Sequence, residues 1–354
     1  MFGIFGNKSS YDENRYPWVD YAKGIAIILV AYRHVLGGYA KAGIYVPEYL
    51  DMVQQSVYNF RMPLFFILAG IFVRKSLVKR GFRKFTFYKL NTILYPYVIW
   101  ATLQLTLQII FSQHTNGDKD ISDYLYLLYY PRALDQFWFL YTIFNITILF
   151  AFFYTYLRIK TVGQLVLGVF FYYLSTLPAV MQISLLQDTL QFYIYFALGA
   201  WGARIILSDQ HRAFFSSPWL FVGLLPFFLV SQWYWVTHQN LRDFAPYLFM
   251  LIAILGSLFV FNIAFMLGKA RAAHFLRVAG HHSLYIYMMH VIALALARVV
   301  LINLLGITHI FILLPLGMVV AVALPIVFYR VTVTHGLWFL YYFKAPRSVK
   351  QTAA

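Results

Sequence analysis

Apolar segments long enough to cross a lipid bilayer recur throughout this 354-residue chain, and they constrain its fold more than any other feature. Hydrophobic residues make up 62% of the sequence, and charged residues make up 11%, against about 25% in a soluble domain. We therefore expect an all-α integral membrane protein, a bundle of about ten transmembrane helices. The expected spans are residues 18–39, 56–73, 90–111, 137–157, 163–181, 189–207, 217–236, 244–268, 283–304 and 309–330.

Lysine and arginine are unevenly divided between the connections. With the N-terminus in the cytoplasm, 19 of these residues fall on the cytoplasmic side, and only Lys41, Lys119, Arg132 and Arg242 fall outside. Cytoplasmic loops of membrane proteins carry such an excess, which predicts an N-in, C-in topology. The distribution of the +16 net charge is thus explained by the predicted membrane topology, and no nucleic-acid partner is expected.

The predicted organisation is a cytosolic tail (1–17), a transmembrane bundle (18–345) and a second cytosolic tail (346–354). The first residues lack the apolar run and cleavage site of a signal peptide, so the first span should be retained. The chain has no cysteine, which excludes disulfides, thiolate metal sites and cysteine nucleophiles. No metal site is expected, because His281 and His282 lack helical ligand spacing with His290.

The first span, WVDYAKGIAIILVAYRH, carries polar groups into the bilayer. Lys23 and His34 are eleven residues apart, which places them on one helix face roughly 16 Å apart along the axis. Asp20 can neutralise Lys23. These groups are candidate catalytic residues, since ionisable side chains in a membrane are costly. The alternatives are an interfacial Asp20–Lys23 pair and a structural His34. Arg33 either reaches outward or joins the site.

Further candidates lie in the second and ninth spans. Arg61, in YNFRMPLFFILAG, is expected near the outer edge, where it either binds lipid phosphate or helps to close the cavity around His34. His290, in SLYIYMMH, is either a neutral core histidine or a substrate-binding residue. Arg61 and His290 are therefore candidate substrate-binding residues.

Two segments near the membrane surfaces complete the set. Residues 74–89 are strongly basic and contain no acid, so they anchor the topology on anionic lipid and can attract an anionic cytosolic substrate. Candidate donor-binding residues here are Arg83, Lys84 and Lys89, together with Lys23. Trp138 and Tyr141 open the fourth span on the outer side, as interface anchors or as sugar-stacking residues.

Taken in order, these segments resemble membrane-bound acyltransferase family 3, in particular its fucose 4-O-acetylase-like and exopolysaccharide O-acetyltransferase branch. The resemblance rests on DYAKGIAIILVAYRH, RMPLFFILAG, YPY at 95–97, FWFLY at 137–141 and SLYIYMMH, from residue 18 to about 330. In that family a basic residue, ten intervening residues and a histidine mark the active site, which corresponds here to Lys23 and His34. Two positions depart from the family pattern, since Ala69 replaces the usual serine and Arg61 a common histidine.

The resemblance implies a multi-pass protein of the bacterial cytoplasmic (inner) membrane with no permanently bound cofactor. It implies transfer of an acetyl or other short acyl group from cytosolic acetyl-CoA (acyl-CoA) to a sugar hydroxyl. The acceptor would be a cell-surface or secreted polysaccharide or its lipid-linked precursor, and polysaccharide assembly machinery is a candidate partner.

Within this scheme His34 acts as general base on the acceptor hydroxyl, because imidazole titrates near neutral pH. A transient acyl-histidine is the alternative. Asp20 orients Lys23, which contacts the donor. The composition also fits a transporter or flippase for polar solutes or lipid-linked sugars, and a scaffold for polysaccharide machinery is a third interpretation.

Overall fold

A computed structural model describes residues 16–111 and 119–345. In these ranges the chain is built of helices and contains no strand. The two predicted tails, apart from residues 16 and 17, lie outside the described residues. The chain divides into two compact units, residues 1–65 with 205–329 and residues 66–204 with 330–354. Each unit is described by itself.

Seven helical segments of the described chain are long and apolar enough to cross a membrane, or eight if α10 (Ser184–Ile206) and α11 (Asp209–Phe215) form one broken span. Each of the ten predicted spans coincides largely with a helix. The helix over 18–39 is less apolar than the seven, because it carries Asp20, Lys23 and Arg33. The helix in 163–181 is only 14 residues long.

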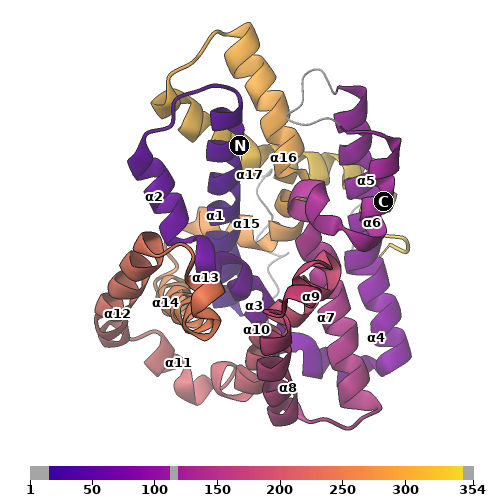
Figure 1. The fold of residues 1–354 in the computed structure, drawn as a ribbon, viewed down its shortest axis with the longest axis vertical. Coiled ribbons are helices and arrows are strands. Elements are labelled where there is room, and N and C mark those ends of the chain that lie inside the picture. Colours follow the sequence, from indigo (N-terminus) through magenta and orange to yellow (C-terminus); the bar gives the residue numbers. More distant parts are fainter. Residues whose placement is uncertain (1–15, 112–118, 346–354) are drawn as a thin grey trace. The chain divides into compact units, whose positions relative to one another are not determined.

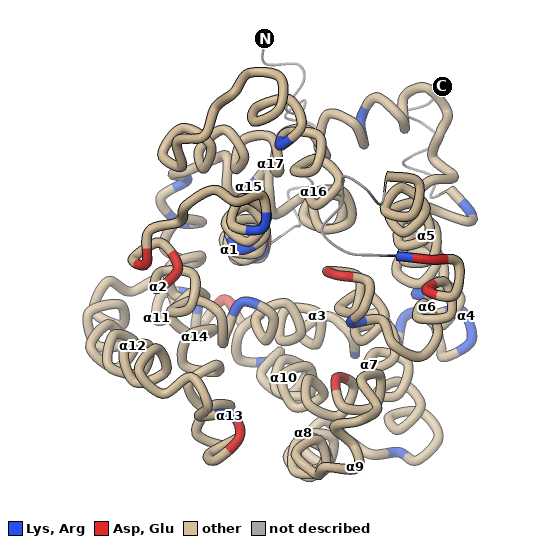
Figure 2. Tube along the Cα trace, turned by 45° about the horizontal axis from the view of Figure 1, so that its top comes forward, with Lys and Arg blue, Asp and Glu red and all other residues tan. Residues whose placement is uncertain are grey.

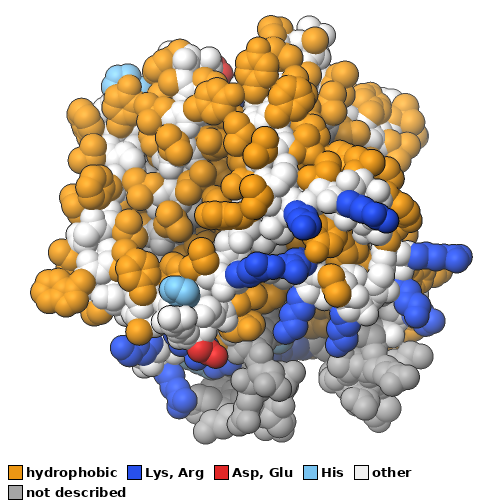
Figure 3. All heavy atoms as spheres, turned by 90° about the horizontal axis from the view of Figure 1, so that it is seen from below, with side chains coloured by type: hydrophobic (Ala, Val, Ile, Leu, Met, Phe, Trp, Pro, Cys, Tyr) orange, Lys and Arg blue, Asp and Glu red, His pale blue; other side chains and the backbone are white. Residues whose placement is uncertain are grey.

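The surface agrees with a membrane protein. Large apolar side chains are widely exposed, among them Val166, Phe227, Trp233 and Val319. On the face drawn in Figure 3, apolar side chains cover most of the surface. So much exposed apolar area suits contact with lipid rather than with water.

The first unit contains the N-terminal helix and most of the C-terminal half of the chain (Figure 1). Its elements are α1 (Pro17–Lys41), α2 (Glu48–Ser56), the start of α3 (Tyr58–Arg80), α11 (Asp209–Phe215), α12 (Pro218–Thr237), α13 (Leu241–Phe244), α14 (Pro246–Ala270), α15 (His274–His281), α16 (Ser283–Arg298), a π-helical turn (Val299–Leu304) and most of α17 (Ile310–Thr334).

Glycines allow α1 and α15 to touch through their backbones. A Cβ added at Gly280 would lie 1.7 Å from the carbonyl oxygen of Asp20, and one added at Gly24 would lie 2.0 Å from that of Leu276. No side chain fits at either position. On the neighbouring α14, Phe265 stacks on Trp18 with ring centroids 4.4 Å apart. The segment of α1 that carries Asp20 and Lys23 is thereby held close to both helices.

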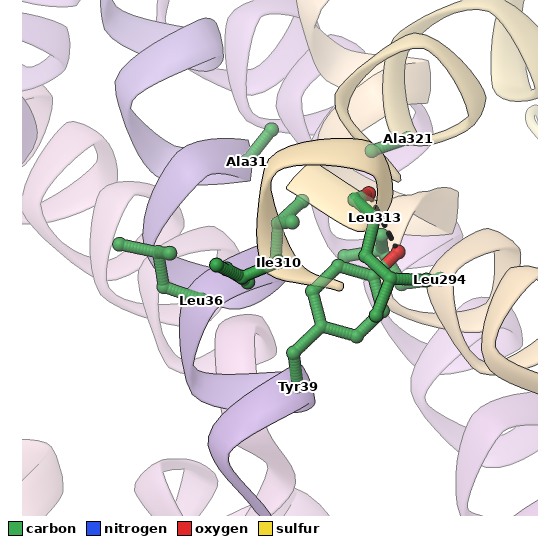
Figure 4. Packing of buried hydrophobic residues seen from close by; sticks show 8 residues of the cluster. Ala31, Leu36, Tyr39, Leu294, Ile310, Leu313 and Ala321 are labelled. Carbon is green, nitrogen blue, oxygen red and sulfur yellow. Dashed lines mark hydrogen bonds between the residues drawn. The ribbon is translucent and has the colours of Figure 1, made fainter. Parts of the chain in front are cut away.

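The other end of α1 is fixed by an apolar cluster with α16 and α17 (Figure 4). The buried members of this cluster are Ala31, Val35, Leu36, Tyr39, Leu294, Ile310, Leu313 and Ala321. The hydroxyl of Tyr39 donates to the carbonyl oxygen of Leu313 at 3.0 Å. Arg298 donates to the carbonyl oxygen of Gly38 at 3.0 Å, which satisfies an acceptor at the helix end.

The second unit contains the middle of the chain and its C-terminal segment. Its elements are the rest of α3, α4 (Phe82–Lys89), a π-helical turn (Leu90–Leu94), α5 (Tyr95–Ile110), 3₁₀ turns at Ile121–Leu125 and Pro131–Phe137, α6 (Tyr126–Tyr129), α7 (Trp138–Thr155), α8 (Thr161–Leu174), α9 (Pro178–Met181), most of α10 (Ser184–Ile206) and a 3₁₀ turn at Trp338–Leu340.

Within this unit α3 and α10 also approach closely. A Cβ added at Gly70 would lie 2.0 Å from the carbonyl oxygen of Phe196, and one added at Gly199 would lie 2.0 Å from that of Ile67. The C-terminal segment is tied to the π-helical turn before α5, because Asn91 and the backbone of Lys344 exchange two hydrogen bonds of 2.9 and 2.8 Å. Lys344 therefore lies close to the end of the basic segment 74–89, and a shared cytoplasmic side for the two stays a prediction.

Candidate functional site

The first unit brings together several of the polar residues expected to act. Asp20, Lys23 and His34 all lie on α1, which runs as one helix from Pro17 to Lys41. The helix predicted for 18–39 is thus confirmed, and with it the shared face of Lys23 and His34. The carboxylate-bearing Asp20 is fully buried, whereas Lys23 and His34 are half-buried.

His34 meets a second histidine from α16. The ring centroids of His34 and His290 are 4.9 Å apart, with the ring planes at 69°. His290 is fully buried, and its Nδ1 lies 2.9 Å from the carbonyl oxygens of Ile286 and Tyr287. Because a carbonyl can only accept, Nδ1 must carry the hydrogen, and in the neutral ring Nε2 then carries the lone pair. The backbone of α16 therefore fixes the tautomer of His290.

Two arginines near the pair of His34 and His290 make cation–π contacts with the same tyrosine ring. The guanidinium carbon of Arg61 is 4.8 Å from the centroid of Tyr58, and that of Arg33 is 5.0 Å from the same centroid. Arg61 is only 4% exposed and donates to Oε1 of Gln54 at 3.2 Å. Arg33 directly precedes His34 in α1, so the two arginines that share this ring lie near the histidine pair. Figure 2 shows the basic positions along α1 and the acidic positions on α2.

The three basic candidates for donor binding lie on α4, in the second unit. Arg83 and Lys84 are exposed. The ammonium of Lys89 lies 5.5 Å from the ring centroid of Phe85 and 5.9 Å from that of Tyr88. The exposed pair is open to an anionic molecule, and the donor-binding role of all three stays a prediction.

Trp138 and Tyr141 also belong to the second unit, where both have packing partners. Arg132 lies 4.5 Å above the Trp138 ring and binds Asp188 through Nε at 2.8 Å. Tyr141 stacks on Tyr97 at 5.2 Å and donates to the carbonyl oxygen of Leu128 at 3.1 Å. These contacts give both rings a structural role, and their contact with a sugar stays a prediction.

Sequence reasoning left Tyr58 out and left the role of Arg33 open. Tyr58 and Arg61 are three residues apart, a spacing that brings side chains together on a helix, so this contact was readable from the sequence. The contact of Arg33 with Tyr58 joins α1 to α3 and has no local signal. Within 16–111 and 119–345, no group of three or more His, Asp or Glu side chains could hold a metal ion.

These features define a multi-pass helical membrane protein whose interior holds a histidine pair and a buried cation. The model of the acyltransferase 3 family, described as an acyltransferase domain, matches residues 16–330. The chain therefore belongs to this family and is a membrane acyltransferase. No curated protein and no solved structure matches it.

Proposed function

We propose that the protein is an O-acyltransferase of the fucose 4-O-acetylase-like and exopolysaccharide branch. It moves an acetyl or other short acyl group from cytosolic acyl-CoA to a sugar hydroxyl of a cell-surface or secreted polysaccharide or its lipid-linked precursor. The observation that carries the proposal is the half-buried His34 ring, 4.9 Å from a His290 ring whose tautomer is fixed. This pairing suits a general base within an acyltransferase.

In the proposed reaction His34 takes the proton of the acceptor hydroxyl, and the hydroxyl oxygen attacks the thioester carbonyl. The carbon–sulfur bond then breaks, and the leaving thiolate takes the proton from the imidazolium. In this scheme His290 Nε2 accepts the N–H of His34 during the reaction, which leaves the other nitrogen of His34 to act as base. The contact between the two rings makes His290 a candidate positioning residue for His34.

The donor approaches from the cytoplasmic face in this scheme. Basic side chains of α4 are proposed to attract its phosphates, and Lys23 is proposed to contact the donor as well. The helix rise separates Lys23 from His34 by roughly 16 Å, a gap that the long pantetheine arm of coenzyme A can bridge. Asp20, buried at the contact of α1 with α15, holds this part of α1 in place.

The test uses the purified full-length protein in liposomes without a solute gradient. Release of coenzyme A from acetyl-CoA, and acetylation of a polysaccharide acceptor followed by mass spectrometry, are expected for the natural sequence. His34→Gln should abolish both, whereas His309→Gln, at an exposed histidine of the same unit, should leave both unchanged.

Two results would overturn the proposal. Acetylation at the natural rate by folded His34→Gln protein would remove His34 from the chemistry. Solute flux that depends on a gradient, with no release of coenzyme A, would instead identify a transporter. Comparison of surface glycans from cells with and without the protein identifies the acyl group and the modified sugar.

A further inference from the structure

Arg61 occupies an environment that leaves most of its charge uncompensated. Only 4% of the residue is exposed, and its guanidinium has five N–H donors. Its contacts are the amide oxygen of Gln54 and the ring of Tyr58, both uncharged. In the described chain no carboxylate lies within ion-pair distance of this side chain or of Arg33. A buried cation without a counter-charge is costly, so it is expected to serve a ligand.

Arg33 adds a second positive charge to the same place. Both guanidinium carbons lie within 5.0 Å of the centroid of Tyr58, so they are within about 10 Å of each other, where like charges repel. The tyrosine ring offsets only part of this repulsion through cation–π attraction. An anionic group between or beside the two guanidinium groups would remove this repulsion and would form charge-assisted hydrogen bonds to both.

The position of this pair relative to His34 suggests which molecule carries the anionic group. Arg33 is the chain neighbour of His34, and Arg61 shares the ring of Tyr58 with Arg33. Along α1, Arg33 is ten residues beyond Lys23, or roughly 15 Å further from the predicted cytoplasmic end. An anion held here is thus close to the proposed base and roughly 15 Å along α1 from Lys23, the residue proposed to contact the donor.

We propose that Arg33, Arg61 and Tyr58 form an anion-binding site for the acyl acceptor, and that the natural acceptor carries a phosphate or carboxylate group near the hydroxyl that is acylated. This inference rests on the proposed function. The anion orients the acceptor, and its hydroxyl is presented to His34. A neutral sugar lacks this anchor and binds less tightly.

The first experiment measures binding alone. Thermal protection of the purified full-length protein is compared for methyl glucuronide against methyl glucoside, and for farnesyl phosphate against farnesol. At least one anionic probe should protect the protein more than its neutral partner, and which one does so distinguishes an acidic sugar from a phosphorylated lipid carrier. Arg61→Gln and Arg33→Gln should lose this difference. Lys41→Gln, at an exposed lysine at the end of the same helix, should retain it.

The second experiment measures catalysis with acetyl-CoA. Loss of a charge-assisted contact should raise KM for the preferred anionic acceptor about ten- to one-hundred-fold in either variant. Arg61→Lys keeps the charge but lacks the two-pronged geometry of a guanidinium. Its KM for the anionic acceptor should therefore lie between those of the natural protein and of Arg61→Gln. Because Arg33 is exposed, Arg33→Gln is expected to fold even where Arg61→Gln does not.

Equal protection by anionic and neutral probes, or an anion preference that is undiminished in folded Arg33→Gln and Arg61→Lys proteins, would overturn the inference. The proposed function would stand in that case, since release of coenzyme A does not require an anionic acceptor. Absence of coenzyme A release with every acceptor would instead contradict the proposed function.

Discussion

At the scale of single residues, the two buried histidines of the segment 281–290 offer a matched comparison. His282 and His290 both place Nδ1 2.9 Å from the carbonyl oxygen four residues earlier, and both are almost fully buried. Only His290 has its ring against His34, whereas His282 lies beside Tyr329. Their structural environments are alike, so a difference between their variants reports on the contact with His34.

We expect His290→Asn to lower kcat about 10²-fold, because a small misplacement of a catalytic group costs about that much. KM for acyl-CoA should change little, and the pH dependence of kcat should shift, since His34 loses its neighbour. His282→Asn should keep the natural kcat and pH profile at a similar thermal stability. Equal losses of kcat in the two variants would show that His290 has a structural role alone.

The histidine pair also shows which parts of a site a sequence reveals. The spacing of Lys23 and His34 predicts a shared helix face because helix geometry is local. His34 and His290 are 256 residues apart in the chain, and only the packing of α16 on α1 brings their rings together. The same holds for Arg33 and Tyr58. Candidate residues were therefore predictable one by one, but their partners on other helices were not.

At the scale of elements, the contact of α1 with α15 depends on the absence of side chains. Gly280→Ala or Gly24→Ala must push backbone atoms apart, at a cost of about 1–3 kcal/mol in stability. Gly37→Ala is the control on the same helix, since nothing lies within 4 Å of its added Cβ, and it should be neutral or stabilising by up to about 1 kcal/mol. Thermal unfolding in detergent measures all three, and an unchanged midpoint for Gly280→Ala would contradict the close packing.

The 3₁₀ turn Ile121–Leu125 carries a prediction about pH. Hydrogen bonds from Ser122 hold the pKa of Asp120 below its usual value. The unfolded segment binds this proton more readily, so the carboxylate stabilises the turn above its unfolded pKa of about 3.9 and ceases to do so as pH falls through the lower folded value. The protection of the backbone amides of residues 121–125 against hydrogen exchange, relative to the intrinsic rate at each pH, should fall with acidification. In Asp120→Ala this protection should be low at every pH, and protection equal to that of the natural sequence at pH 7 would rule out the cap.

Hydropathy predicted the positions of the helices well. It did not predict which helices are long and apolar enough to span a membrane, because one is short and another carries several charged residues. Each of the ten apolar stretches coincides largely with a helix. The stretch 163–181 breaks after Leu174, because the chain turns before Pro178, and α8 is left too short to count as a full span. The first stretch carries the polar groups of the site, which lower its apolarity. The polar residues of the candidate site thus make this span harder to recognise by hydropathy.

At the scale of the whole molecule, the predicted N-in, C-in topology can be tested directly, because the chain has no cysteine and any introduced thiol is unique. Lys75 in the basic segment and Thr308 between α16 and α17 are both exposed. Charge counting places the first in the cytoplasm and the second outside. The experiment uses cells whose outer envelope is permeabilised and whose cytoplasmic membrane is intact. In these cells a membrane-impermeant maleimide should label Thr308→Cys at once, and it should label Lys75→Cys only after the cytoplasmic membrane is permeabilised as well. The reverse pattern would invert the topology, and it would place the arginine pair and the proposed acceptor on the cytoplasmic side.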